Sequence, residues 1–320
     1  MKSLYLETST VGLGAWSWGD RTGYWAVDVK GDKGNNQAAY EAAISAGITM
    51  IDTAEVYGFG LSEQYLGDFI AATGTKPEVA TKYAPLPWRL TRGSVPKACK
   101  SSLKRLQQDK LGLYMQHWPG FFGPNYFCND AFINGLGDCL DEGLCKAVGV
   151  SNFNAKRVQK ASKILEGRGL CLASNQVQYS LMYRAPETNG VLEACREAGT
   201  TLIAYSPLCQ GLLTGKYSPE NKPKGGRAGF YKEENFRGVQ VLLDLMGKIG
   251  EERGGKSKVQ IAINWCLAKD VLPIPGAKNA RQVDDIAGAL GWRLSDAEVA
   301  ELDEVSSKIP RATGAPFENW

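Results

Sequence analysis

Four residues able to move protons follow short apolar stretches that are typical of buried strands. Asp52 and Tyr57 lie in GITMIDTAEVYG, and Lys82 lies in EVATKYAP. His117, the only histidine of the chain, lies at the end of KLGLYMQHWP. A carboxylate, a phenol, an amine and an imidazole gathered at one place form a site that donates a proton to a developing oxyanion. Such a site also needs a hydride donor.

Tyr57 is the expected acid. Because a free phenol has a pKa of about 10, we expect the Lys82 ammonium to lower that pKa and Asp52 to hold the ammonium in place. His117 would donate to the substrate carbonyl oxygen or orient it. Taken singly, an aspartate at a strand end more often caps a turn, and the combination is the stronger signal. A Schiff-base aldolase built on Lys82 is an alternative, but a close carboxylate would keep the amine charged.

The elements that position these residues alternate regularly along the chain. Short apolar or β-branched runs predict strands near residues 10–15, 48–53, 78–83, 111–117, 146–151, 173–178, 201–206 and 271–275. Amphipathic stretches between the runs predict at least eight helices. Asn154 and Ser257 are expected N-caps, and Gly47, Gly143 and Gly199 are expected just beyond helix ends.

Strict alternation of strands and helices predicts a parallel sheet, and eight repeats fit a (β/α)8 TIM barrel. We expect one domain over residues 1–320, with extra helices and long loops on the C-terminal face. These loops span 17–36, 118–130 and 208–235. A doubly wound sheet is the alternative. The barrel is favoured because no GxGxxG follows the first strand, and because all four candidate residues lie at strand ends, which a barrel brings together on one face.

Composition excludes several functions. The 37 basic and 34 acidic residues leave a net charge of +3, which does not indicate nucleic-acid binding. No apolar stretch approaches the roughly 18 residues of a membrane span. The eight dispersed cysteines, including Cys99, Cys139, Cys195 and Cys266, are expected to be buried thiols, and no zinc or other metal site is expected. We expect a cytoplasmic protein, or a plastid stromal one if a transit peptide has been removed. The oligomeric state is open, with a monomer slightly favoured.

Eight ordered motifs resemble the aldo-keto reductases. They are IDTAEVYG, ATKYA, MQHWP, AVGVSN, NQVQYS, AYSPL, GLLTGKY and IPGAKN, and the match runs from Gly12 to about Leu302. The resemblance implies a (β/α)8 barrel, NADP(H) as cofactor, and the catalytic tetrad Tyr57, Asp52, Lys82 and His117. IPGAKN followed by ALGWRLSDAEVAEL is most similar to the plant and algal plastid-type oxidoreductase branch.

The resemblance also implies cofactor contacts. From the nicotinamide to the adenosine end they are Trp16, Ser151, Asn152, Gln176, Tyr205, Ser206, Pro207, Leu208, Gly211, Lys216, Arg227, Gly276, Ala277, Lys278, Gln282 and Asp285. Tyr205 would stack on the nicotinamide ring, whose partly cationic face suits an aromatic partner. Lys278 would neutralise a 2′-phosphate, which is the reason for NADPH over NADH. Asp285 and Ile286 depart from the Glu-Asn pair of many members, which predicts an altered adenine contact.

Aromatic residues on the predicted loops suggest an apolar substrate pocket formed by Trp18, Trp25, Trp88 and Trp118, although tryptophans at such positions can equally belong to the core. The function predicted is NADPH-dependent reduction of small aldehydes or ketones, with pyridoxal as one candidate. The alternative is a regulatory subunit, similar to potassium-channel β-subunits, that holds NADPH with weak reductase activity. The complete tetrad favours the enzyme.

Overall fold

Eight parallel strands form the centre of the protein. The computed structural model describes residues 8–28, 31–121 and 123–310. The strands are β1 (Gly12–Gly14), β2 (Met50–Asp52), β3 (Glu78–Tyr83), β4 (Leu111–Gln116), β5 (Cys145–Ser151), β6 (Ser174–Gln178), β7 (Thr201–Tyr205) and β8 (Leu272–Ile274), hydrogen-bonded in that order. Gly14 pairs in parallel with Gly276 and its N–H reaches the Pro275 carbonyl at 2.9 Å, which joins the first strand to the last. The predicted barrel is confirmed, and residues 1–7 and 311–320 of the predicted domain lie outside the described residues.

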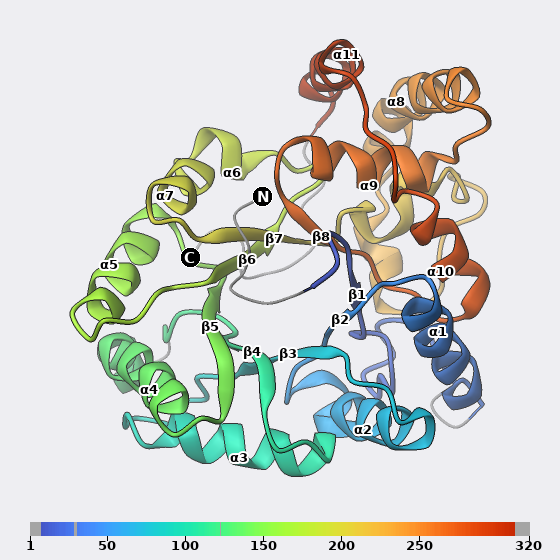
Figure 1. Ribbon diagram of the computed structural model, residues 1–320. Helices are drawn as coiled ribbons and strands as arrows, with labels where there is room; N and C mark the ends of the chain where they lie inside the picture. The colour runs from blue at the N-terminus through green and yellow to red at the C-terminus, as the bar shows by residue number, and fades with distance from the viewer. Residues whose placement is uncertain (1–7, 29–30, 122, 311–320) are drawn as a thin grey trace.

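Helices surround the barrel (Figure 1). They are α1 (Lys33–Ser45), α2 (Leu61–Thr73), α3 (Ser94–Leu106), α4 (Asn129–Asp141), α5 (Ala155–Glu166), α6 (Ala185–Thr188), α7 (Val191–Glu197), α8 (Glu233–Glu252), α9 (Lys258–Ala268), α10 (Ala280–Ala287) and α11 (Asp296–Ser307). Four 3-10 turns follow strands, namely η1 (Tyr57–Gly60), η2 (Gly123–Cys128), η3 (Cys209–Thr214) and η4 (Gly226–Phe230). The helices bury the outer faces of the strands.

Helix ends follow the predicted signals. The Asn154 side chain accepts a hydrogen bond from the first turn of α5, and Ser257 begins α9 with a capping box. Gly47, Gly143 and Gly199 have φ values of 77°, 69° and 64°, a left-handed conformation that glycine adopts without a steric penalty. These signals therefore located real helix ends.

The core has two layers. Side chains that point into the barrel form a small cluster that includes Met50, Leu113, Met115 and Ile203. A larger cluster fills the space between strands and helices. All eight cysteines are free thiols, and the four predicted to be buried in helices lie buried in α3, α4, α7 and α9. The six buried cysteines therefore act as small apolar residues. The expectation is wrong for Cys171, which is exposed, and for Cys128, which is only partly buried.

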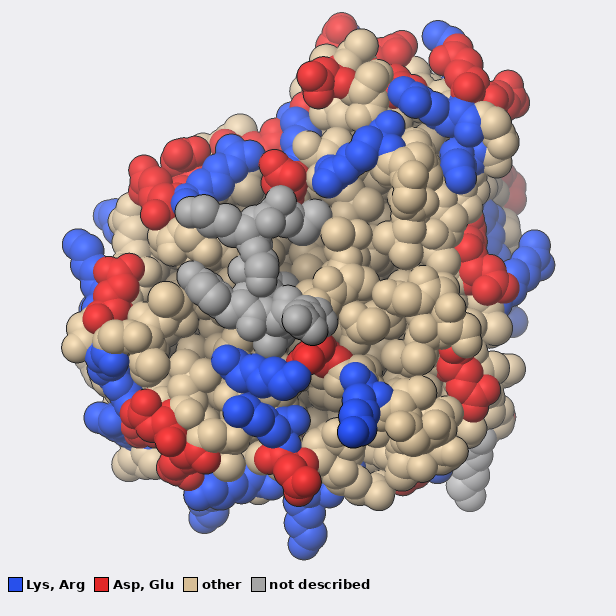
Figure 2. All heavy atoms as spheres, in the orientation of Figure 1, with Lys and Arg blue, Asp and Glu red and all other residues tan. Residues whose placement is uncertain are grey.

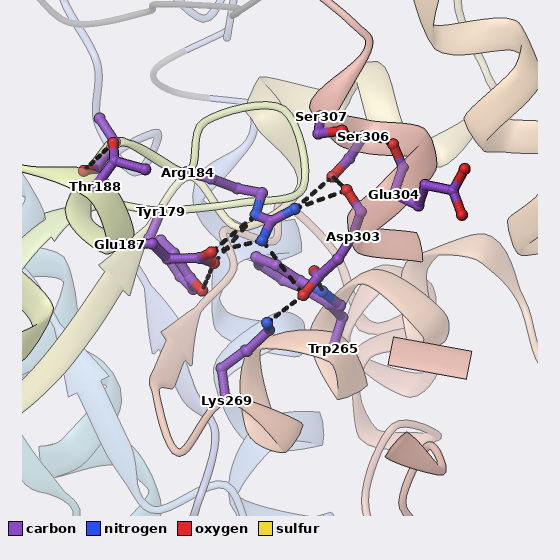
Figure 3. Close-up of polar contacts among 11 residues, drawn as sticks. Tyr179, Arg184, Glu187, Thr188, Trp265, Lys269, Asp303, Glu304, Ser306 and Ser307 are labelled. Atoms are coloured by element: carbon purple, nitrogen blue, oxygen red, sulfur yellow. Dashed lines mark hydrogen bonds and ion pairs between the residues drawn. The ribbon is translucent and has the colours of Figure 1, made fainter. Parts of the chain in front are cut away.

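A polar network attaches α11 to the barrel (Figure 3). The Arg184 guanidinium donates to Glu187 at 2.5 Å and to the Asp303 carbonyl at 2.8 Å. The Trp265 indole N–H donates to the Asp303 carboxylate at 2.8 Å, and the Tyr179 ring stacks on Trp265 with centroids 5.0 Å apart. Because Tyr179 directly follows β6, the network connects α11 to a strand of the barrel.

Charged side chains of both signs are interspersed over the face seen in Figure 2, in keeping with the net charge of +3. Among the described residues, no helix combines the length and the apolar character needed to cross a membrane. Over the same residues, no group of three or more His, Cys, Asp and Glu side chains is placed to hold a metal ion.

Candidate active site

Lys82 is the centre of the site. Its ammonium donates to the Asp52 carboxylate at 2.6 Å, to the Thr53 carbonyl at 2.8 Å and to the Tyr57 hydroxyl at 3.4 Å. Lys82 is 0% exposed and Asp52 is 2% exposed. These three acceptors match the three donors of an ammonium group, and they fix Lys82 between the carboxylate and the phenol. The contact with Thr53 was not predicted from sequence, because backbone acceptors leave no signal in residue types.

His117 completes the group from the next strand. It directly follows β4, its backbone N–H donates to the Tyr83 carbonyl at 2.8 Å, and its ring lies edge-on to Tyr57 with centroids 5.6 Å apart. The four residues singled out in the sequence therefore meet at one place. They do so because β2, β3 and β4 are neighbours that end on the same side of the barrel.

Burial dominates the electrostatics of the ion pair and the phenol. Burial raises the pKa of Asp52 and lowers the pKa of Lys82, and the attraction between the two charges opposes both shifts. Burial also raises the pKa of Tyr57 well above its usual value, and the negative charge of Asp52 adds to the rise. The net pKa of Tyr57 is therefore raised and not lowered, because desolvation of the phenolate and the charge of Asp52 outweigh the attraction of the ammonium at 3.4 Å. Tyr57 is a protonated phenol at neutral pH.

The imidazole of His117 is neutral at pH 7. Burial lowers its pKa well below the usual value, and the positive charge of Lys82 lowers it further. A neutral imidazole carries one N–H, so His117 can donate one hydrogen bond through its ring while accepting at the other nitrogen. Tyr57 and His117 are thus two neutral donors side by side.

Polar side chains from β5 and β6 continue the site. The Gln176 side-chain amide donates to Oδ1 of Asp52 at 2.8 Å, the carboxylate oxygen that Lys82 does not contact. The Ser151 hydroxyl donates to the backbone carbonyl of Gln176 at 2.7 Å. Asn152, with φ of 60°, donates to the His117 carbonyl at 3.0 Å and accepts from the Tyr205 hydroxyl at 3.0 Å. Ser151, Asn152 and Gln176 were predicted from the sequence, but the Gln176–Asp52 bond was not; the available signal was a run of polar side chains in the predicted strand, of which β6 reads SNQVQ.

Three cations gather at the other end of the site, and we call Lys216, Arg227 and Lys278 the basic cluster. The Lys278 ammonium donates to the Trp25 carbonyl at 2.8 Å, and the Arg227 guanidinium donates to the Tyr217 hydroxyl at 2.8 Å. Burial and the positive charge of Arg227 lower the pKa of Lys278 to about 8, and Lys216 contributes in the same direction. Like charges held together and partly desolvated favour an anion between them, so these residues fit the phosphates of a dinucleotide.

The loop after β1 connects the two ends of the site. The Trp16 ring stacks on Tyr57 with centroids 6.1 Å apart and on Tyr24 at 5.3 Å, and it meets the edge of Trp25 at 5.0 Å. The Tyr24 hydroxyl donates to the Gln210 side chain at 2.7 Å. This contact joins the loops after β1 and β7, and sequence analysis did not foresee it.

The remaining expected cofactor residues follow β7 and β8. Ser206, Pro207, Leu208 and Gly211 form tight turns at the end of β7, with φ of 51° at Ser206 and 104° at Gly211. Gly276 is exposed beside Gly14, and the side chain of Gln282 accepts from the Lys278 backbone N–H at 2.8 Å. Ala277 is buried.

The expectation for Trp18 is wrong, and the expectation for Asp285 stays a prediction. Trp18 is a core residue and no pocket wall: it is fully buried, packs edge-on against Phe69, and donates its indole N–H to the Ala277 carbonyl at 2.8 Å. Asp285 is directed to the start of α9, because its carboxylate accepts from the Ser257 hydroxyl at 2.5 Å and from the Gln260 amide at 3.3 Å. One oxygen of the Asp285 carboxylate therefore supports the start of α9, and its contact with adenine stays a prediction.

The other expected pocket residues lie in different surroundings. Trp118 packs against His117 with centroids 4.6 Å apart, beside the tetrad. Trp25 lies under the basic cluster, 5.1 Å from the Arg227 guanidinium. Trp88 is exposed on the loop after β3. Trp118 is therefore the predicted pocket tryptophan whose ring contacts a tetrad residue, and its role in a substrate pocket stays a prediction.

Known proteins share this chain's sequence and fold. Residues 10–307 match the model of the Aldo/keto reductase family. The chloroplastic pyridoxal reductase of Arabidopsis thaliana is 39% identical over 318 residues, which are 96% of this chain and 86% of the relative. An NADP(+) aldo-keto reductase of Schizosaccharomyces pombe is 34% identical over 288 residues, 84% of this chain and 82% of the relative.

Solved structures agree. The glycerol dehydrogenase of Gluconobacter oxydans superposes with a TM-score of 0.82 at 29% identity, covering 97% of this chain and 94% of its own. An aldo-keto reductase of Klebsiella pneumoniae in complex with NADPH superposes with a TM-score of 0.74 at 27% identity, covering 96% and 94%. With the family model covering most of its length, this chain belongs to the aldo/keto reductase family.

Proposed function

We propose that the chain reduces the carbonyl group of small aldehydes or ketones with NADPH, and that Tyr57 donates the proton. The observation that carries the proposal is the buried ammonium of Lys82, held between Asp52 and the Tyr57 hydroxyl, with the neutral His117 ring beside the phenol. When bound, NADPH supplies the hydride.

Residues of the chain position the substrate, donate the proton and stabilise the charge that develops. His117 donates its ring N–H to the carbonyl oxygen and holds it beside the Tyr57 hydroxyl. Tyr57 gives its proton to that oxygen as negative charge develops there, and the Lys82 ammonium 3.4 Å away stabilises the phenolate that remains. Asp52 and Gln176 keep the ammonium in position. The raised pKa of Tyr57 keeps the proton in place until the oxyanion forms.

The cofactor residues support NADP(H). Ser151, Asn152, Gln176 and Tyr205 form a connected polar patch next to the tetrad and would hold the nicotinamide end. The basic cluster would hold the phosphates, and Lys278 the 2′-phosphate. The NADP(+) aldo-keto reductase of Schizosaccharomyces pombe and the NADPH complex of the Klebsiella pneumoniae enzyme agree with this cofactor.

Pyridoxal is a specific candidate substrate. A flat heteroaromatic aldehyde suits a tetrad flanked by the rings of Trp16 and Trp118, and a relative at 39% identity is named a chloroplastic pyridoxal reductase. That relative and the eight free thiols support a reducing compartment, either the cytoplasm or the plastid stroma.

Tyr57→Phe tests the assignment of the acid. We expect turnover of pyridoxal or benzaldehyde to fall about 100-fold to 10,000-fold, the usual contribution of a general acid. NADPH binding, followed by protein fluorescence, should hardly change. Tyr40→Phe is the matched control, because Tyr40 lies on α1, outside the tetrad, and the change removes a phenol hydroxyl that is hydrogen-bonded to Thr75. Substantial residual turnover in Tyr57→Phe would contradict the proposed role.

A further inference from the structure

The first turn of α2 contributes two buried polar side chains that contact the segments around Lys82. Ser62 and Glu63 are the second and third residues of α2, and they belong neither to the tetrad nor to the expected cofactor residues. Both are 0% exposed, as are Thr53, Thr81 and Lys82. Buried hydroxyls and carboxylates are costly unless they are hydrogen-bonded. The partners of Ser62 and Glu63 therefore show which segments this turn holds.

Ser62 holds Thr53 by a hydrogen bond whose direction is fixed. The Ser62 hydroxyl oxygen lies 3.0 Å from the Ala15 carbonyl oxygen and 2.8 Å from the Thr53 hydroxyl oxygen. A serine hydroxyl has one proton and a carbonyl only accepts, so Ser62 donates to Ala15 and Thr53 donates to Ser62. The backbone carbonyl of Thr53 accepts from the Lys82 ammonium at 2.8 Å. A chain of contacts therefore runs from Ala15 through Ser62 and Thr53 to Lys82.

Glu63 holds the strand that carries Lys82. Its Oε1 accepts from the Thr81 hydroxyl at 2.6 Å, and its Oε2 accepts from Nε of Arg105 at 2.5 Å. Thr81 directly precedes Lys82 in β3, and successive side chains of a strand point to opposite faces. Glu63 therefore fixes β3 from its helix side, while the Lys82 side chain lies on the opposite face. The negative charge of Glu63 also raises the pKa of Lys82, against the larger effect of burial.

α2 is itself packed directly on the end of α3. A Cβ on Gly67 of α2 would lie 2.8 Å from the backbone carbonyl oxygens of Arg105 and Leu106, so a larger residue would push the two helices apart. A Cβ on Gly60, the residue before α2, would lie 3.0 Å from the Arg105 side chain. The first turn of α2 is therefore a fixed support, which a site that must hold a charged group in one place requires.

The position of the Lys82 ammonium depends on this support. The ammonium lies 2.6 Å from the Asp52 carboxylate and 2.8 Å from the Thr53 carbonyl, but 3.4 Å from the Tyr57 hydroxyl. The two shorter contacts set where the ammonium lies, and they thereby set its distance from the phenol. Asp52 holds one of these contacts, and the segment that α2 fixes provides the other.

We propose that Ser62, Glu63 and the Thr53 hydroxyl are positioning residues that keep the Lys82 ammonium directed at the Tyr57 hydroxyl. Ser62 acts through Thr53, and Glu63 acts through β3. This inference rests on the proposed function and extends the residues that serve the reaction to the first turn of α2.

Thr53→Val and Thr53→Ser separate the hydroxyl of residue 53 from its shape, because valine keeps the shape and serine keeps the hydroxyl. The measurement is the single-turnover rate of NADPH oxidation with benzaldehyde, which reports the chemical step. We expect this rate to fall about tenfold in Thr53→Val and in Ser62→Ala, because a slightly misplaced charged group slows the chemistry. Thr53→Ser should keep most of the wild-type rate. The double variant Thr53→Val/Ser62→Ala should be no slower than either single variant, because the two residues act as a unit.

Thr200→Val is the matched control for the loss of a threonine hydroxyl. Thr200 is buried, and its hydroxyl donates to the Leu172 carbonyl at 2.9 Å. Because Thr200 precedes β7, it lies at the opposite end of the barrel from the tetrad. The single-turnover rate of this variant should equal that of the wild type.

Glu63→Gln tests the same support through the pH dependence of the single-turnover rate. The charged form of Lys82 is the active one, and the attraction of Glu63 raises its pKa. Without that attraction the pKa of Lys82 falls further, so the rate should be lost at a lower pH on the alkaline side than in the wild type. Arg105, left without its partner, acts in the same direction. The other titratable groups beside the ammonium are unchanged in this variant, namely Asp52, Tyr57 and His117.

Glu78→Gln is the matched control for the loss of a carboxylate. Glu78 begins β3, four residues before Lys82, and pairs with Lys146. Its removal should leave the alkaline limb of the rate where it is in the wild type.

The outcomes separate this inference from the proposed function. Wild-type rates in Thr53→Val and Ser62→Ala, or equal losses in Thr53→Val and Thr53→Ser, would overturn the positioning role. An alkaline limb that does not move in Glu63→Gln would overturn it as well. Should Thr53→Val fail to fold, Ser62→Ala decides the question with the same expected loss. A wild type that binds NADPH but reduces none of the carbonyl compounds would instead overturn the proposed function.

Discussion

Replacing Lys82 with methionine tests the buried ion pair at the centre of the candidate active site. The ammonium is 0% exposed, and its removal leaves the Asp52 carboxylate buried with the Gln176 hydrogen bond at 2.8 Å. Breaking a buried pair from one side costs about 3–5 kcal/mol. We therefore expect the free energy of unfolding of Lys82→Met to fall by about that amount.

The double variant shows whether the loss comes from the pair. Asp52→Asn in the Lys82→Met background removes the buried charge, so the two changes together should cost less than the sum of the single changes by about 2 kcal/mol or more. Urea unfolding followed by circular dichroism gives the four free energies of this cycle. Lys33→Met is the matched control, because its ion pair with Asp68 is exposed at 42% and 46% and should contribute about 1 kcal/mol or less.

Two results would refute this reasoning. One is a cost for Lys82→Met no larger than that for Lys33→Met. The other is strict additivity of Lys82→Met and Asp52→Asn, since residues that do not interact give additive changes. Either result would mean that the ion pair seen at 2.6 Å contributes little to stability.

The remaining predictions concern the basic cluster and the tryptophans. If the charged form of Lys278 binds the 2′-phosphate as proposed, NADPH affinity should weaken as pH rises through about 8, because the pKa of Lys278 is lowered to about 8. Lys278→Gln should flatten this dependence, with NADH as the control ligand; a steep profile that survives in the variant would exclude Lys278 as its origin. Trp18→Ala should cost about 3–5 kcal/mol of stability because Trp18 is core, whereas Trp88→Ala should stay within about 0.5 kcal/mol. Equal losses in urea unfolding would show that the two tryptophans were assigned to the wrong environments.

The sequence predicts the strands well because their apolar runs are short and bounded by turn residues. The run at 78–83 coincides with β3 (Glu78–Tyr83), whereas the run at 10–15 is longer than β1 (Gly12–Gly14). The meeting of Asp52, Lys82 and His117 follows from the barrel alone, because parallel neighbouring strands end together. Residue types and topology are sufficient for this part of the site.

Contacts between loops were beyond sequence analysis. The Trp18 side chain points into the core, where its indole N–H bonds the Ala277 carbonyl, 259 positions away in the chain. The bond from Tyr24 to Gln210 depends on the tight turn at Gln210, where φ is 54°. The pKa of Tyr57 depends on how far its hydroxyl is removed from water, and a strand pattern does not give this for a residue in a loop. These features come from three-dimensional packing of segments that have no common periodicity.

The polar network that attaches α11 to the barrel is connected through Tyr179 to residues beside the tetrad. Tyr179, which stacks on Trp265 in that network, also donates its backbone N–H to the carbonyl of Tyr205 at 3.3 Å. Tyr205 in turn bonds Asn152 beside the catalytic residues. Shortening the protein from its C-terminal end past Asp303 would therefore loosen the support of Tyr205, so α11 is a poor place to trim when preparing a minimal enzyme.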